Sequence, residues 1–203
     1  MLLIDKVSVH RGKQLLKYDF SLAEGLIMTV QGRSGAGKST LLDLIAGFLQ
    51  PESGDILWNG QSLLPLSVEL RPVSMLFQAN NLFEHISVLK NLQLGLNIDP
   101  VQAGLTAGQI QFAADALEVG ALLQRKPAEL SGGQRQRIAL LRTLLRPEPL
   151  VLLDEPFTGL DDETRELAAE WTLHTARKER KTVLLITHQD DDVTRLADVN
   201  LRL

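Results

Sequence analysis

The run Gly32–Thr40 has the residue types and spacing of a loop that holds phosphate groups. Glycines let backbone N–H groups converge on phosphate oxygens, and a helix that begins there adds the positive end of its dipole. We expect Lys38 to reach the β- and γ-phosphates of a nucleoside triphosphate, and the Ser39 hydroxyl to bind Mg²⁺. Thr40 is expected near the α- and β-phosphates. The predicted phosphate-binding residues are Gly32, Arg33, Ser34, Gly35, Ala36, Gly37, Lys38, Ser39 and Thr40.

An acidic pair, Asp154 and Glu155, directly follows the apolar run Leu150–Leu153 and precedes Pro156. An acid at the end of a buried strand is suited to hold Mg²⁺ through a water molecule, and the next acid is suited to act on the water that attacks a phosphate. The alternative is two solvated acids in a loop, which the apolar strand and the proline disfavour. We therefore predict Asp154 as a metal ligand, together with Ser39.

A second candidate anion site is the run Ser131–Gln134. Ser131 is placed as the N-cap of a helix predicted over Arg135–Arg146, which Pro147 ends. The two glycines leave the backbone open, and the positive end of the helix dipole faces outward. Standing alone, the same pattern could be no more than a capped helix. The residues of this candidate site are Ser131, Gly132, Gly133 and Gln134.

Four apolar runs are each followed at once by polar groups that could do chemistry. Continuous apolar runs are typical of parallel strands that are buried on both faces. Because ligands bind beyond the carboxyl ends of strands in open parallel sheets, we expect one edge of the sheet to gather these groups. The four predicted strands are Leu26–Val30, before the glycine-rich loop; Val73–Phe77, before Gln78; Leu150–Leu153, before the acidic pair; and Thr182–Ile186, before Thr187 and His188.

The remaining patterns predict a single α/β domain, residues 1–203, with a helical insertion. Short strands are expected over Val7–Val9 and Tyr18–Leu22, and Ile56–Gly60 contains an Asn-Gly hairpin turn. From 79 to 146 the apolar period is helical, which predicts a helical subdomain between the core segments 1–78 and 147–203. The helix after the acidic pair is expected to turn Leu160, Leu167 and Trp171 toward the core.

Composition narrows the class of protein. The 203 residues are 44% hydrophobic and 23% charged, which suits one compact domain with a real core. A net charge of −4 gives no pull toward nucleic acid or an anionic membrane. Cysteine is absent, which excludes disulfides and thiolate metal sites and fits a reducing compartment. The start, Met1–Lys6, becomes charged too early for a signal peptide, and no apolar run approaches the roughly 20 residues of a membrane span. We expect a soluble, cytoplasmic protein.

With Leu130 before it, the run Ser131–Gln134 resembles the signature loop of the ATP-binding-cassette (ABC) ATPases, and the resemblance extends from Val7 to about Asp198. It implies a P-loop NTPase core with a mixed, mainly parallel sheet, an antiparallel β edge and the inserted helical subdomain. It also implies ATP and Mg²⁺ as cofactors. In this family the signature loop contacts the γ-phosphate bound by another copy. The resemblance therefore implies a head-to-tail dimer that buries two ATP molecules, and a monomer that hydrolyses ATP poorly.

The resemblance also implies roles for single residues. Glu155 matches the general base, and His188 matches the histidine that hydrogen-bonds the γ-phosphate. Gln78 matches the glutamine that senses the γ-phosphate and Mg²⁺, which makes it a catalytic residue and a metal ligand. Asp161, at the end of the run Phe157–Asp161, matches the aspartate that crosses the dimer interface.

One departure from the family concerns the nucleotide base. Where the family stacks adenine on an aromatic side chain, this chain has Arg11 or, counted differently, His10. Arginine can stack on a base through its planar guanidinium, so we expect binding to persist while the selectivity for adenine stays open.

Family members that carry no membrane segment are mostly the separate ATPase subunits of bacterial importers. The resemblance thus implies transmembrane permease subunits, a second ATPase subunit and, indirectly, a substrate-binding protein as partners, at the inner face of the plasma membrane. The stretch Gln78–His85 fits the groove that receives a permease helix. The second half of the chain, with Ala139–Arg142 and the helix that carries Trp171, looks more like short, poorly characterised relatives. Three segments look like the ATPases of thiamine importers, which makes thiamine the favourite among small-molecule substrates: Arg71–Gln78, Asn80–Phe83 and Leu94–Asn97.

Two other functions fit the sequence less well. A soluble ABC ATPase that acts on DNA or ribosomes would carry long coiled coils, a second cassette or basic linkers, and this chain has none of them. A regulator that does not hydrolyse ATP is disfavoured by the presence of Lys38, Asp154, Glu155 and His188.

Overall fold

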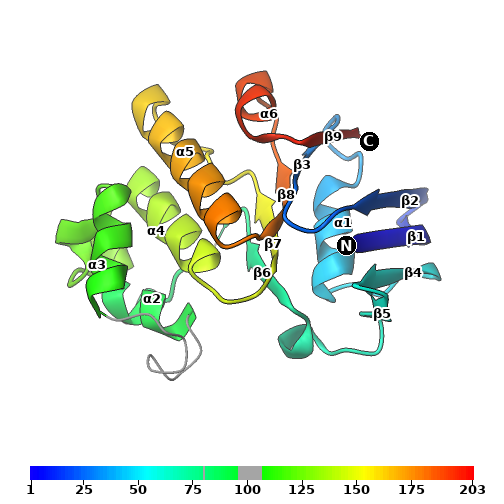
Figure 1. The fold of residues 1–203 in the computed structure, drawn as a ribbon, viewed down its shortest axis with the longest axis horizontal. Coiled ribbons are helices and arrows are strands. Elements are labelled where there is room, and N and C mark those ends of the chain that lie inside the picture. Colours follow the sequence, from blue (N-terminus) through cyan, green and yellow to red (C-terminus); the bar gives the residue numbers. More distant parts are fainter. Residues whose placement is uncertain (80, 96–106) are drawn as a thin grey trace.

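A sheet of five parallel strands forms the centre of the computed structural model, which describes residues 1–79, 81–95 and 107–203 (Figure 1). All neighbouring pairs are parallel, so the carboxyl ends of the strands share one edge of the sheet. The four apolar runs are confirmed as parallel strands, each to within one residue at either end. In spatial order the strands are β6 (Val73–Leu76), β7 (Leu150–Asp154), β8 (Thr182–Ile186), β3 (Ile27–Gln31) and β9 (Val199–Arg202).

Alternate side chains of this sheet enter two different hydrophobic clusters. In β7, Leu150 and Leu152 pack with the helix α1 (Lys38–Ala46), whereas Val151 and Leu153 pack with the helix α4 (Gly132–Leu144). Successive residues of a strand point to opposite faces, so a strand covered on both faces must be apolar throughout. This is why the strands that carry the functional groups are continuous apolar runs in the sequence.

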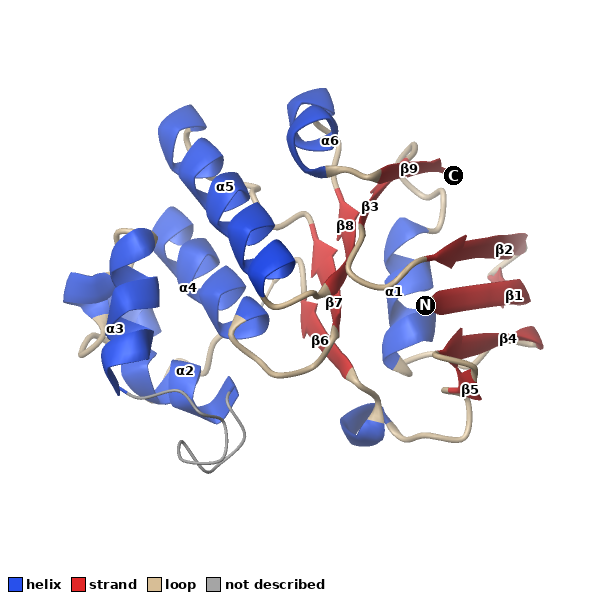
Figure 2. Ribbon diagram, viewed as in Figure 1, coloured by secondary structure: helices blue, strands red, loops and turns tan. Residues whose placement is uncertain are grey.

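A second, antiparallel sheet lies beyond α1 (Figure 2). The predicted antiparallel strands therefore form a sheet of their own, with α1 packed between the two sheets, rather than an edge of the parallel sheet. Asn59 and Gly60, with φ of 50° and 81°, make the expected turn between the strands Ser53–Trp58 and Gln61–Ser62. The strand order is β2 (Gln14–Leu22), β1 (Leu2–Arg11), β4 (Ser53–Trp58) and β5 (Gln61–Ser62).

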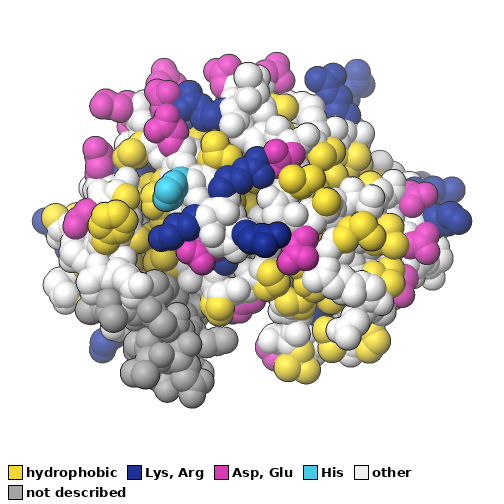
Figure 3. Space-filling model, viewed as in Figure 1, with side chains coloured by type: hydrophobic (Ala, Val, Ile, Leu, Met, Phe, Trp, Pro, Cys, Tyr) yellow, Lys and Arg dark blue, Asp and Glu magenta, His cyan; other side chains and the backbone are white. Residues whose placement is uncertain are grey.

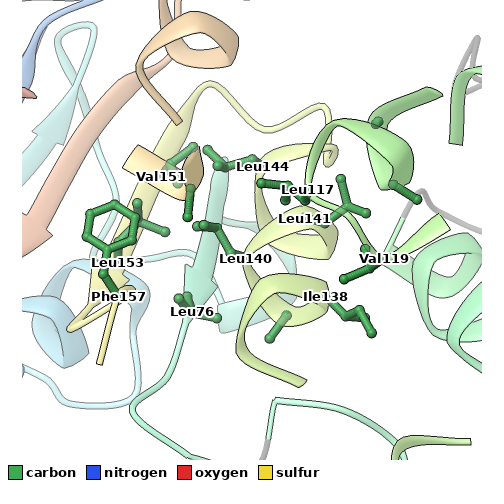
Figure 4. Packing of buried hydrophobic residues seen from close by; sticks show 14 of the residues in the cluster. Leu76, Leu117, Val119, Ile138, Leu140, Leu141, Leu144, Val151, Leu153 and Phe157 are labelled. Carbon is green, nitrogen blue, oxygen red and sulfur yellow. The ribbon is translucent and has the colours of Figure 1, made fainter. Parts of the chain in front are cut away.

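Helices cover the opposite face of the parallel sheet. α4 and α5 (Asp162–Lys178) pack against it, and α2 (Val88–Gly95) and α3 (Ala107–Ala116) lie farther out (Figure 1). Figure 4 shows leucines of α4 meeting β6 and β7 on one side and Leu117 and Val119 on the other. The division into a core and an inserted helical subdomain stays a prediction, although the described elements between β6 and β7 are helical.

The buried face of α5 differs from the expected one. It consists of Ala168, Ala169, Thr172 and Ala176, together with Thr175. Leu160 and Trp171 pack against the core as predicted, but Leu167 is not among the residues that do. Small side chains let α5 approach α4 and the sheet closely, and a face of this kind gives no pattern of large apolar residues in the sequence.

The remaining elements are short. The helix α6 (Asp190–Leu196) follows β8, and 3₁₀ turns occupy Val68–Leu70, Gly120–Leu122 and Pro127–Glu129. Within the described ranges, the chain has no helix that is both long and apolar enough to cross a bilayer. Asn80, Leu96 and Asn97, which belong to the segments that resemble thiamine importers, lie outside the described residues.

Candidate active site

The glycine-rich loop connects β3 to α1 at the carboxyl edge of the parallel sheet. Gly37 occupies the N-cap position of α1 with φ 97°, and none of the described side chains caps this helix end. A Cβ at Gly37 would lie 2.5 Å from the Tyr18 hydroxyl, so conformation and space both require glycine here. The first N–H groups of α1 therefore point out of the helix without a side-chain partner, which is the arrangement that binds phosphate.

Lys38 places its ammonium group on this loop. The side chain is buried, and Nζ donates to the carbonyl oxygens of Gly32 at 2.9 Å and Arg33 at 3.0 Å. The cation is thus satisfied by the loop itself, and it lies where a phosphate held by the loop would meet it. Lys38 and the start of α1 together supply the charge and the donors that a nucleotide phosphate needs.

Tyr18 of β2 ties the antiparallel sheet to this loop. Its hydroxyl donates to the carbonyl oxygen of Gly37 at 2.8 Å. Burial raises the pKa of Tyr18 to about 12, while the nearby charge of Arg11 acts in the opposite direction. The phenol therefore stays protonated as a donor. Arg11, the residue expected at the nucleotide base, lies close enough to influence Tyr18 in β2 and Asp43 in α1.

Asp154 ends β7 beside the same loop. Its side chain is buried, and burial raises the pKa of its carboxyl group, against which a hydrogen bond from Ser39 and the charge of Lys38 act. Mg²⁺ takes few protein ligands and completes its shell with water and phosphate oxygens. A buried carboxylate joined to a serine hydroxyl at the end of a phosphate-binding loop is a donor set that fits this ion.

Glu155 adopts a backbone conformation that is unusual for its residue type. Its φ is 50°, in the left-handed region, and its N–H donates to the carbonyl oxygen of Ile186 at 3.1 Å. The carboxylate lies 3.2 Å from Nε2 of His188 and accepts a hydrogen bond from the Thr158 hydroxyl, also at 3.2 Å. The structure thus brings together the predicted general base, which follows β7, and the histidine predicted to hydrogen-bond the γ-phosphate, which follows β8.

Gln136 supports this turn and was missed in the sequence. Its side-chain amide donates to the carbonyl oxygen of Pro156 at 2.8 Å and lies 3.5 Å from that of Glu155. Gln136 stands in the first turns of α4, so the helix that begins at the signature run reaches the acidic pair within one chain. Its only signal in the sequence is its position two residues after Gln134.

The signature run caps α4 as expected. The Ser131 hydroxyl accepts from the Gln134 N–H at 3.2 Å, and the Gln134 side chain accepts from the Ser131 N–H at 3.0 Å. This reciprocal cap starts α4 three residues before the predicted helix. A Cβ at Gly133 would lie 3.3 Å from the Leu160 side chain, so the signature run lies against the segment that precedes α5.

Asp161 is the N-cap of α5, through a single side-chain bond rather than a reciprocal pair. Its carboxylate accepts from the Thr164 N–H at 2.9 Å, and hydrogen bonds from the Thr164 side chain and backbone lower the pKa of Asp161. In Figure 1 the start of α1 and the starts of α4 and α5 lie on opposite sides of the parallel sheet. The two candidate anion sites of one chain therefore do not meet.

Gln78 follows β6, at the same edge of the sheet as β7. The Asn81 side chain holds both backbone groups of the preceding residue, Phe77, with bonds of 2.8 Å to its N–H and 2.5 Å to its carbonyl oxygen. Gln78 itself is exposed. The structure thus puts Gln78 at the predicted edge but shows no partner for it among the described residues.

Comparison with known proteins agrees with this arrangement. The ABC transporter family model matches residues 15–158. The chain is 44% identical over 197 residues to the "Thiamine import ATP-binding protein ThiQ" of Aliivibrio fischeri, covering 97% of this chain and 84% of that protein. It is 41% identical over 182 residues to the protein of the same name from Escherichia coli, with 90% and 78% covered.

A solved structure, the dimeric post-hydrolysis state of the ATP-binding cassette MJ0796 bound to ADP and phosphate, superimposes with a TM-score of 0.81 at 25% identity, covering 99% of this chain and 96% of that one. The phosphate-binding loop, the acidic pair and the capped signature run thus occur in a fold that is shared with an ATP-binding cassette. The chain belongs to the ABC transporter family.

Proposed function

We propose that this chain is the ATP-hydrolysing subunit of a thiamine importer. The observation that carries the proposal is the convergence of Lys38, Asp154, Glu155 and His188 at one edge of the parallel sheet. The relatives named as thiamine import ATP-binding proteins match nearly the whole chain, which supports thiamine as the substrate.

The residues divide the work of hydrolysis. The loop 32–37, Lys38 and Thr40 hold the phosphates, and Glu155 accepts a proton from the water that attacks the γ-phosphorus. The bond between that phosphorus and the oxygen of ADP then breaks, and His188 stabilises the charge on the phosphate that leaves. Ser39, Asp154 and Gln78 would hold Mg²⁺, which would offset the negative charge of the phosphates.

A second copy completes each site. The residues at the start of α4 are Ser131, Gly132, Gly133 and Gln134. The parallel sheet lies between α4 and α1 (Figure 1), so the start of α4 does not reach the phosphate-binding loop of its own chain. A head-to-tail pair of chains brings this helix end to the γ-phosphate of the other copy, and Asp161, which caps α5 next to it, then lies at the contact. Two nucleotides are buried in such a pair.

A groove on the chain supports the permease as partner. A cavity of about 390 Å³ lies between α1, β6 and the end of α4. It is lined by Phe48, Phe77 and Phe83, which are 53%, 39% and 46% exposed. Arg142 stacks over the Phe83 ring at 5.1 Å. Exposed aromatic side chains around a hollow are typical of protein interaction sites, and a permease helix is the occupant we propose.

The proposed setting is the cytoplasmic face of the inner membrane, where a substrate-binding protein acts through the permease and does not touch this chain. A nucleic-acid partner has no support here. The face in Figure 3 gathers acidic side chains along its upper edge and mixes basic with apolar ones below, and the net charge is −4.

Affinity purification from detergent-solubilised native membranes tests this function. The chain, tagged at its N-terminus, should bring down a multi-span permease, and Phe83→Asp should lose it because a carboxylate would be buried in the groove. The matched control is Phe112→Asp on α3, which is 77% exposed and outside the groove, and which should keep the permease. Loss of thiamine uptake in cells that carry Lys38→Ala would identify the substrate. Recovery of only ribosomal or DNA-associated partners would contradict the proposal.

A further inference from the structure

Hydrogen bonds of the neighbouring residues hold the backbone of the loop that carries His188. The Thr187 hydroxyl accepts from the Gln189 N–H at 3.1 Å and bonds to the carboxylate of Asp192. The Thr187 N–H also reaches the carbonyl oxygen of Val30 at the end of β3. The residues on both sides of His188 are therefore fixed by one hydroxyl group, which depends on Asp192.

Asp192 is itself fixed by an arginine from another helix. Nε and Nη2 of Arg165 donate to the two carboxylate oxygens at 3.0 and 2.6 Å. Asp192 is only 3% exposed, and Arg165 also lies over the buried ring of Phe157, with 6.0 Å from Cζ to the ring centroid. A two-pronged pair of this kind fixes direction as well as distance, which a single point charge does not.

The pair and the catalytic groups surround the same small cavity. It measures about 50 Å³, and its lining includes Glu155 and His188 as well as Arg165, Thr187 and Asp192. A space of this size holds water when polar groups surround it. A change in the Arg165–Asp192 pair therefore alters the wall of the cavity that the predicted general base faces.

We infer that Arg165 is a positioning residue which, through Asp192 and Thr187, holds His188 in the orientation that faces Glu155. The inference rests on the proposed function, because it assigns a task to residues that serve hydrolysis. A purely structural pair would stabilise the contact of α5 with α6 and leave turnover unchanged. A positioning pair must affect turnover while the fold and the binding of nucleotide are kept.

The test replaces both partners at once. Removing only one partner leaves a buried charge unpaired, whereas exchanging both for apolar groups of similar size often preserves the fold. The double variant Arg165→Met with Asp192→Leu should keep its melting temperature within a few degrees and its ATP affinity within about twofold. Its kcat should fall roughly tenfold or more, because small misplacements of reacting groups cost rates of that order.

Hydrogen exchange gives a readout that does not need hydrolysis. The amides of residues 187–189 should exchange about tenfold faster in the double variant, since the hydroxyl that fixes them has lost its acceptor. The matched control is Arg195→Met, which breaks a more exposed ion pair between the same helices, from Arg195 to Glu166 at 2.7 Å. This control should leave both the exchange and kcat unchanged.

Arg165→Lys keeps a cation beside Asp192 but not the two-pronged geometry, and it serves if the double variant fails to fold. It should show a smaller loss of kcat and a smaller rise in exchange. The inference would be overturned if the folded double variant kept both the exchange and the kcat of wild type. If the double variant does not fold, the same result in Arg165→Lys would overturn it. If His188→Ala keeps the wild-type rate while exchange rises in the double variant, the role proposed for His188 fails and the support of its loop by Arg165 stands.

Discussion

Asp154 and Asp198 show how differently two carboxylates can be treated in one chain. Burial raises the pKa of Asp154. Burial acts in the same direction on Asp198, but hydrogen bonds from the Arg177 side chain and the Ile27 N–H outweigh it and lower that pKa. The first carboxylate lies at the predicted metal site and the second holds α5 and β3 together. The carboxylate whose pKa is raised by burial is thus the one that lies where a cation is expected to bind.

These shifts predict opposite effects of Asp→Asn on the stability of the nucleotide-free, metal-free chain. A group whose pKa is raised in the folded state adds stability at pH values below its unfolded-state pKa. This contribution is lost as the pH rises through the folded-state pKa. Ionised Asp154 therefore costs stability at pH 7, and Asp154→Asn should raise the melting temperature by several degrees.

A group whose pKa is lowered in the folded state adds stability at pH values above its unfolded-state pKa. This contribution is lost as the pH falls through the folded-state pKa. Asp198→Asn should therefore lower the melting temperature at pH 7. Thermal melts of both variants check the pair. For Asp154→Asn the difference from wild type should shrink as the pH falls toward 3.8, the ordinary value. For Asp198→Asn the difference should persist down to 3.8 and shrink only below it. A fall in the melting temperature of Asp154→Asn at pH 7 would contradict this account.

At the scale of elements, the sequence predicts what regular apolar runs and caps determine. The four parallel strands are found to within a residue, because a strand between two layers has to be apolar throughout. β1 and β2 are longer than the predicted Val7–Val9 and Tyr18–Leu22, since alternate residues of these strands are exposed and dilute the apolar signal. A register shift between Ile4 and Val7 interrupts the pattern further.

The contacts that position catalytic residues could not be predicted from single positions. Arg165 and Asp192 are 27 residues apart, and Gln136 and Pro156 are 20 apart. Each of these pairs exists only because the fold brings two helices, or a helix and a loop, together. In the sequence, Asp192 looks like the third of three acids that favour the start of a helix.

The contact of Gln136 with the acidic pair predicts that α4 affects hydrolysis within its own chain. Gln136→Leu keeps the size of the side chain but removes the donor to the Pro156 carbonyl, so the strained turn at Glu155 loses its support. We expect kcat to fall roughly tenfold with ATP affinity unchanged. The control is Gln111→Leu on α3, a surface glutamine that pairs with Asp115. An unchanged kcat in Gln136→Leu would show that the turn at Glu155 does not need the Gln136 side chain.

At the scale of the whole molecule, the two candidate anion sites on opposite sides of the sheet predict that association of two chains is needed for hydrolysis. Glu155→Gln should retain Mg²⁺ and ATP, lose about a hundredfold or more in kcat, and accumulate as a dimer, because the sandwich forms but is not opened by hydrolysis. Light scattering after gel filtration with ATP measures the dimer, and Lys38→Ala should stay monomeric. Wild-type turnover in Glu155→Gln would remove Glu155 from its role.

Lys38 has a further consequence for the pace of the cycle. Its ammonium group is bonded to the carbonyl oxygens of Gly32 and Arg33, which belong to the same loop. On the proposed role of Lys38, release of the phosphates returns the ammonium group to these two acceptors, and we expect the energy of the buried cation to differ little between the two arrangements. We therefore expect Lys38 to add little to the barrier for release of the products, although it is the residue predicted to bind the phosphates.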